Sequence, residues 1–140
     1  MKNRIQTFFA AYEQRFNDAL GGQQVDVEET TAAFADYFVE SSPAGVMGGM
    51  NDEQFKEQIP KGFEFYKSIG TLSMKIGQLD ITELDEFHAM AKVHWISAYK
   101  GNRQIEFDVH YFLNMLNGAP KIFAYITGDE QKVLSENGLV

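Results

Sequence analysis

The fold is decided by one stretch, residues 86–127, which reads EFHAMAKVHWISAYKGNRQIEFDVHYFLNMLNGAPKIFAYIT. Aromatic and β-branched residues dominate it, as they do in β-strands. Two turn signals, Gly101-Asn102 and Asn117-Gly118, divide it into three runs. Such pairs between β-type runs are strong signals for hairpins. The stretch therefore predicts a three-stranded antiparallel meander.

The residues before the meander predict helices that cover one face of its sheet. Apolar side chains recur at helical spacing, so that helices are expected over residues 3–20, 27–38 and 51–70. Pro60 is expected to kink or split the third helix, because proline removes an amide donor. Alternation then predicts a strand from residue 71. We expect an α+β fold in a single domain of residues 1–140, with N-terminal helices packed on a curved antiparallel sheet.

The composition excludes several classes of function. The net charge is −8 and the pI about 4.8, which disfavours nucleic acid and anionic membrane surfaces as partners. The absence of cysteine excludes disulfides and thiolate metal sites. No signal peptide and no membrane span of about 20 apolar residues is recognisable. A cytoplasmic location is the expectation.

Two short motifs carry a resemblance to a known family. Tyr12 stands in the run Ala-Ala-Tyr of the first helix, and Asp108 opens the run Asp-Val-His-Tyr-Phe in the meander. Together with the order of elements, these runs resemble ketosteroid isomerase and the wider nuclear transport factor 2-like superfold, also called SnoaL-like or cystatin-like. The resemblance implies an α+β cone with a pocket, in which Tyr12 and Asp108 form an oxyanion hole. The general base of that family is an aspartate before Pro-x-Gly, and Ser42 stands there in this sequence.

The register of the first hairpin decides which residues face the pocket, because side chains alternate across a strand. A two-residue turn at Gly101-Asn102 places Trp95 opposite Asp108, and a two-residue turn at Asn117-Gly118 places His110 opposite Tyr125. The pocket face would then carry Val93, Trp95, Ser97, Tyr99, Glu106, Asp108, His110, Phe112, Phe123, Tyr125 and Thr127. A three-residue first turn is the alternative. It makes the odd-numbered residues of both strands an apolar core and leaves Asp108 and His110 on a solvated outer face.

The preferred register predicts the site residues. Catalytic roles are predicted for Asp108, His110 and Tyr12, and ligand contacts for Trp95, Tyr125, Phe112 and Phe123. An apolar pocket would raise the pKa of Asp108 and let its protonated carboxyl donate a hydrogen bond. His110 would act as acid or base near neutral pH. Glu40 is a weaker candidate for the missing base, and no metal or cofactor is expected.

Two classes of function follow from these residues. One is a small-molecule-binding protein with an enclosed apolar pocket and cofactor-independent isomerase, cyclase or dehydratase chemistry. The other is a non-catalytic domain whose pocket is filled by its own side chains. A homodimer through the sheet is also expected, because the preferred register leaves a wide apolar face outward. That face would carry Ile96, Ala98, Ile105, Phe107, Val109, Tyr111, Ile122, Ala124 and Ile126.

Overall fold

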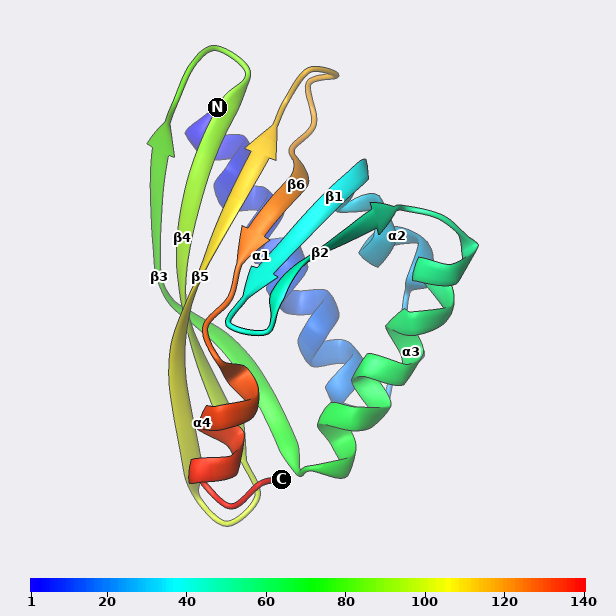
Figure 1. Cartoon of the computed structure of the whole chain (residues 1–140), viewed down its shortest axis with the longest axis vertical. Helices are drawn as coiled ribbons and strands as arrows, with labels where there is room; N and C mark the ends of the chain where they lie inside the picture. Colours follow the sequence, from blue (N-terminus) through cyan, green and yellow to red (C-terminus); the bar gives the residue numbers. More distant parts are fainter.

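Helices and one curved sheet build the computed structural model, which describes residues 1–140 apart from the side chains of Glu130 and Gln131 (Figure 1). The elements in chain order are α1 (Lys2–Leu20), α2 (Val27–Ala32), β1 (Phe34–Ser42), β2 (Gly45–Met50), α3 (Glu53–Ser68), β3 (Thr71–Glu83), β4 (His88–Tyr99), β5 (Arg103–Asn114), β6 (Lys121–Ile126) and α4 (Glu130–Glu136). The sheet has six strands in the order β2-β1-β6-β5-β4-β3. Neighbouring strands are antiparallel except β1 and β6, which are parallel. The predicted α+β fold and the predicted meander are confirmed.

Helix α1 lies on the concave side of the sheet and is fixed to it by packing and by polar contacts. Ile5 and Phe9 face the sheet and are fully buried. Asn17 binds the backbone of β3 twice, since its amide donates to the Met74 oxygen at 2.7 Å and its carbonyl accepts from the Met74 nitrogen at 2.8 Å. The side chain of Glu13 accepts from the Ile76 amide two residues on. Together these contacts hold α1 along the β3 edge.

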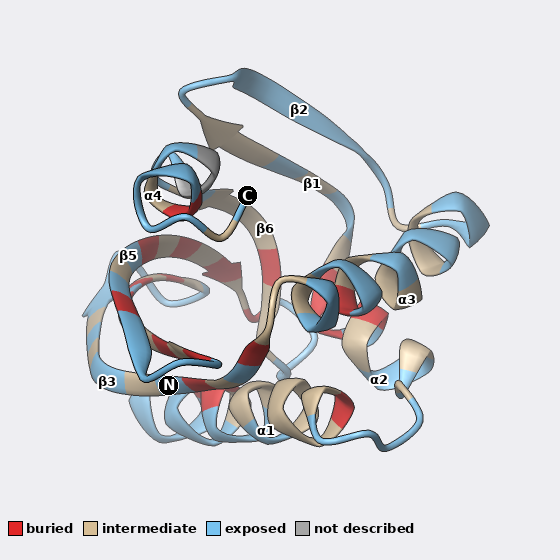
Figure 2. Cartoon of the chain, turned by 90° about the horizontal axis from the view of Figure 1, so that it is seen from below, coloured by how far each residue is buried: buried red, intermediate tan, exposed pale blue. Residues whose placement is uncertain are grey.

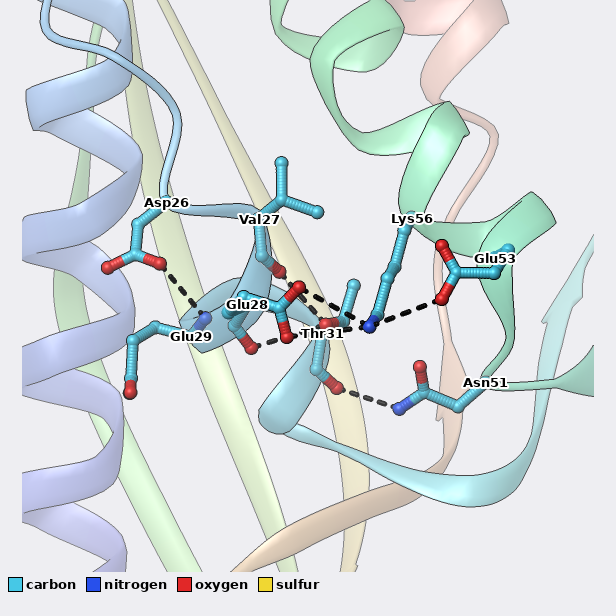
Figure 3. A network of polar contacts seen from close by, with 8 residues as sticks. All are labelled: Asp26, Val27, Glu28, Glu29, Thr31, Asn51, Glu53 and Lys56. Carbon is cyan, nitrogen blue, oxygen red and sulfur yellow. Dashed lines mark hydrogen bonds and ion pairs between the residues drawn. The ribbon is translucent and has the colours of Figure 1, made fainter.

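A second polar network joins α2 to the start of α3 (Figure 3). Asp26 caps α2 by accepting from the Glu29 amide, and Lys56 of α3 forms ion pairs with Glu28 and Glu53. Asn51 donates to the backbone oxygen of Thr31 at 2.8 Å. It also donates to the oxygen of Phe34 at 3.1 Å. The network therefore fixes the two helices that stand beside β1.

Three details of the helical part differ from the sequence prediction. The second helix ends at Ala32 rather than near residue 38, because the chain turns there into β1. The third helix begins at Glu53 rather than at residue 51, because Asn51 binds the end of α2 and Asp52 caps α3 by accepting from the Phe55 amide. Pro60 lies inside α3, which runs from Glu53 to Ser68 in one piece, so the predicted split is wrong.

The register of β4 and β5 follows the three-residue alternative. Tyr99 pairs with Arg103, which places Trp95 opposite Phe107 and His94 opposite Asp108. Lys100 leaves the ladder because its amide donates to the Gly70 oxygen at 2.9 Å, at the junction of α3 and β3. The two turn residues both take positive φ, 86° at position 101 and 59° at position 102, as glycine and asparagine readily do. The preferred two-residue register is therefore wrong.

A bulge in β6 changes the facing of its residues. Leu113 pairs with Ile122, but Phe112 pairs with Ala124, so that Phe123 is an extra residue in the ladder. A bulge of this kind reverses the alternation beyond it. As a result both Ile122 and Tyr125 face the helices.

The core lies between the concave face and the helices. The odd-numbered positions of β4 from 89 to 99 are buried, and so are most odd-numbered positions of β5 (Figure 2). Helix α4 closes one end of the sheet, where Leu134 packs with Tyr99 and Ile105. Asp129 caps this helix by accepting from the Lys132 amide. Among the described residues, no helix combines the length and the apolar character needed to cross a bilayer.

Candidate functional site

A cavity of about 300 Å³ opens between the concave face, α1, α3 and the segment that leads into α4. Aromatic and aliphatic side chains form most of its wall. Its lining residues are Tyr12, Phe16, Phe34, Glu40, Tyr66, Met74, Trp95, Tyr99, Ile105, Phe107, Val109, Tyr111, Tyr125, Thr127, Gly128, Asp129, Val133 and Leu134. This volume stands at the lower end of the range for small-molecule sites, roughly 300–1,000 Å³.

A chain of hydrogen bonds leads along the wall to Tyr12. The indole nitrogen of Trp95 donates to the Tyr111 hydroxyl at 3.1 Å, and both side chains are buried. Burial raises the pKa of Tyr111 well above its usual value, so its hydroxyl stays protonated. Burial also raises the pKa of Tyr12, while Arg15 and a hydrogen bond with Tyr111 act in the opposite direction. The hydroxyl of Tyr12 therefore also stays protonated, and Tyr111 is its hydrogen-bond partner in the cavity wall.

A carboxylate from β1 also lines this cavity. Glu40 pairs with Tyr125 across the parallel strands β1 and β6, and the Tyr125 hydroxyl donates to its Oε2 at 3.0 Å. The ring of Tyr125 stacks on that of Tyr111, with centroids 6.1 Å apart. The cavity wall thus carries a hydrogen-bond donor, Tyr12, and a proton acceptor, Glu40. These are the two groups that acid–base chemistry on a neutral molecule requires.

The structure brings only part of the predicted site together. Tyr12, Trp95 and Tyr125 line the cavity, as expected. Asp108 and His110 lie on the opposite, outer face of β5, because the turn before them takes three residues. Their assignment to the pocket face is wrong.

The surroundings of Asp108 are those of a surface ion-pair cluster. The ring nitrogens of His94 contact two carboxylates, Nδ1 at 2.8 Å from Asp108 and Nε2 at 2.9 Å from Glu106. A neutral imidazole has one N–H, so both bonds require the protonated ring. The hydrogen bonds that His94 donates to Glu106 and Asp108 accordingly raise its pKa, and the bond that Asp108 accepts lowers the pKa of Asp108. The expected rise in the pKa of Asp108 is therefore also wrong.

Two of the predicted ligand contacts also lie on the outer face. Phe112 and Phe123 pack against each other with ring centroids 6.4 Å apart, and the edge of His88 meets Phe123. Neither phenylalanine lines the cavity. The homodimer was predicted from an outward apolar face, and five residues of that face turn inward in the structure. They are Ile105, Phe107, Val109, Tyr111 and Ile122. The homodimer stays a prediction without that argument.

The sequence held a signal for the correct facing. In β5 every odd-numbered residue from Ile105 to Leu113 is apolar or aromatic, whereas Glu106, Asp108 and His110 occupy even positions. This alternation indicates that Tyr111 faces the pocket. The motif shared with ketosteroid isomerase had placed Asp108 inward and therefore Tyr111 outward. Among the described residues, no cluster of histidine and acidic side chains has the arrangement of a metal site.

Comparison with known proteins agrees with this architecture. A family model described as "NTF2-like protein (DUF6841)" matches residues 2–130. The chain belongs to this NTF2-like family. No curated protein gives a significant match to it.

Solved structures similar to this NTF2-like protein share its fold at low sequence identity. An NTF-2 like protein of unknown function from Shewanella oneidensis MR-1 superposes with a TM-score of 0.71 at 13% identity, over 91% of this chain and 98% of that one. An NTF2-like protein with a cystatin-like fold from Novosphingobium aromaticivorans gives 0.68 at 9% identity, over 99% and 88%. A ketosteroid isomerase-like protein from Erwinia carotovora atroseptica gives 0.56 at 15% identity, over 89% and 92%. At these identities the likeness establishes the fold alone.

Proposed function

We propose that this protein binds a small ring-containing molecule in the cavity and catalyses proton transfer on it without a cofactor. The observation that carries the proposal is that Tyr12 and Glu40 line the same aromatic cavity. Apolar walls with a few convergent polar groups are typical of small-molecule sites. One structural neighbour is described as a ketosteroid isomerase-like protein, a name that agrees with proton transfer as the reaction class.

The reaction class follows from the two groups. Glu40 is the base that removes a proton from the carbon next to a carbonyl group, and Tyr12 donates a hydrogen bond to the oxygen that becomes negative. Where a C=C bond is conjugated with the enolate, return of the proton to the far carbon moves the double bond and gives an isomerisation. Where a hydroxyl group stands on the β carbon, its C–O bond breaks, the proton held by Glu40 passes to it, and it leaves as water, which gives a dehydration. Tyr12 shares a hydrogen bond with Tyr111, which accepts from Trp95, and linked hydrogen bonds of this kind strengthen one another.

The test uses 2-tetralone, a neutral bicyclic ketone with exchangeable protons beside its carbonyl. We expect the protein to accelerate exchange of these protons in D2O, followed by NMR. Glu40→Gln should bind the ketone with little change but lower the exchange rate by a factor of about 10² or more, the usual contribution of a positioned base. Glu64→Gln is the control, because Glu64 is an exposed carboxylate on α3 outside the cavity.

A second variant tests the place of binding. Val109 is buried in the cavity wall, so Val109→Phe should fill the cavity and abolish binding of 2-tetralone in calorimetry. Val46→Phe introduces the same side chain at a position that is 72% exposed on β2 and should leave binding unchanged. Exchange that persists in Val109→Phe, or that is equal in Glu40→Gln and the unmodified protein, would contradict the proposed function.

A further inference from the structure

A second chamber of about 400 Å³ adjoins the cavity on the side of α3. We call it the vestibule. Six residues line both spaces: Tyr12, Phe16, Phe34, Glu40, Tyr66 and Tyr125. The polar residues that line only the vestibule are Arg15, Thr30 and Gln58. A molecule seated in the cavity therefore extends into a space with a different chemical character.

Arg15 is the basic side chain among the residues that line the vestibule. Its guanidinium stands 6.0 Å from the centroid of the Tyr12 ring. Among the described side chains it forms no ion pair, although the protein carries a net charge of −8. Lys56, by contrast, contacts two carboxylates. An arginine beside an aromatic chamber and without a carboxylate partner presents the planar set of donors that matches a carboxylate ligand.

The two chambers differ in the charged side chains that line them. The carboxylates of Asp129 and Glu40 line the inner cavity, whose described lining holds no basic side chain, and this disfavours an anion there. Glu40 also borders the vestibule, but there the guanidinium of Arg15 offsets its charge and, with the amide of Gln58, offers donors to an anion. A ligand with a single negative charge is thus oriented with its ring inward and its charge outward.

From this arrangement we propose that the natural ligand is a cyclic carboxylic acid, whose ring occupies the cavity and whose carboxylate binds Arg15. This inference rests on the proposed function, because it assigns the substrate class of the same site. Arg15 contacts the bound carboxylate and places the reacting carbon of the ring between Glu40 and Tyr12. Its role is binding and orientation.

The test compares 2-naphthylacetate with 2-naphthylacetamide, which share a ring and differ in charge. Calorimetry at pH 7 should show the acid binding about tenfold more tightly than the amide, as expected for one charge-assisted hydrogen-bonded pair. Arg15→Gln should remove this preference and leave the affinity for the amide unchanged. Lys61→Gln is the matched control, because it removes the same charge from an exposed position on α3 and should keep the preference.

Salt gives an independent readout. Added NaCl should weaken binding of the acid and leave binding of the amide unchanged, since it screens the contact with Arg15. Equal affinities of acid and amide for the unmodified protein would overturn the assignment of Arg15 while leaving the proposed function standing. A preference for the acid that survives in Arg15→Gln would overturn it too. Absence of binding by either compound would contradict the proposed function and the inference with it.

Discussion

Replacement of Tyr111 by phenylalanine tests the register and the hydrogen-bonded cavity wall together. The Tyr111 hydroxyl accepts the Trp95 indole N–H at 3.1 Å, in a place where Trp95 is 2% and Tyr111 is 5% exposed. Phenylalanine keeps the ring but leaves the indole donor buried without its acceptor. A buried donor that loses its partner costs about 1–3 kcal/mol, so Tyr111→Phe should lower the free energy of unfolding by that amount.

The assay is equilibrium unfolding in urea. The midpoint should fall while the slope with denaturant stays the same, because the surface exposed on unfolding hardly changes. Tyr37→Phe is the control, since Tyr37 is 69% exposed and its replacement should change stability by no more than about 0.5 kcal/mol. Equal midpoints for Tyr111→Phe and the unmodified protein would refute the reasoning, because an outward Tyr111 has its hydroxyl in water and loses nothing.

Three further predictions concern other parts of the structure. His94→Gln should destabilise the protein more in acid than in alkali. The pKa of the folded His94 is raised above 6.5, so the stability that the protonated ring contributes is lost as the pH rises through that pKa. A difference in melting temperature between the variant and the unmodified protein that stays the same from pH 5 to 9 would count against this prediction. Gly48→Ala should cost about 1–3 kcal/mol, since a Cβ there would lie 2.8 Å from a backbone oxygen of β1, whereas Gly49→Ala, with open space, should be nearly neutral in the same urea assay. Asn17→Ala should lower the free energy of unfolding by about 1–2 kcal/mol, because it removes two hydrogen bonds to β3. Amide hydrogen exchange in β3 should become faster, and unchanged exchange would speak against this role of Asn17.

Sequence periodicity was sufficient for the fold but not for the facing of every strand. The strong β-type runs and their turn pairs identify the meander, because local propensity and turn chemistry agree there. The register depended on a tertiary contact, since the amide of Lys100 binds Gly70 far away in the sequence and lengthens the turn by one residue. The bulge at Phe123 likewise has no local signal.

The candidate site was also predictable only in part. Tyr12 and Trp95 could be placed in the cavity from helix periodicity and strand parity, whereas Tyr125 faces it only because of the bulge at Phe123. Asp108 was misplaced because a short motif was given more weight than the apolar alternation of the strand that carries it. The sequence indicated Glu40 only as a weaker candidate for the base and did not indicate Arg15, because the positions of both depend on how β1 and α1 pack against distant elements.

The most direct test of the central claim, that the aromatic cavity is a ligand site, uses the only tryptophan of the chain. Trp95 lies in the cavity wall, so its indole N–H gives a single NMR resonance that reports on the site. Titration with 2-tetralone should shift this resonance in a saturable manner in the unmodified protein and leave it in place in Val109→Phe. An indole resonance that does not move while the ketone binds elsewhere would contradict the account.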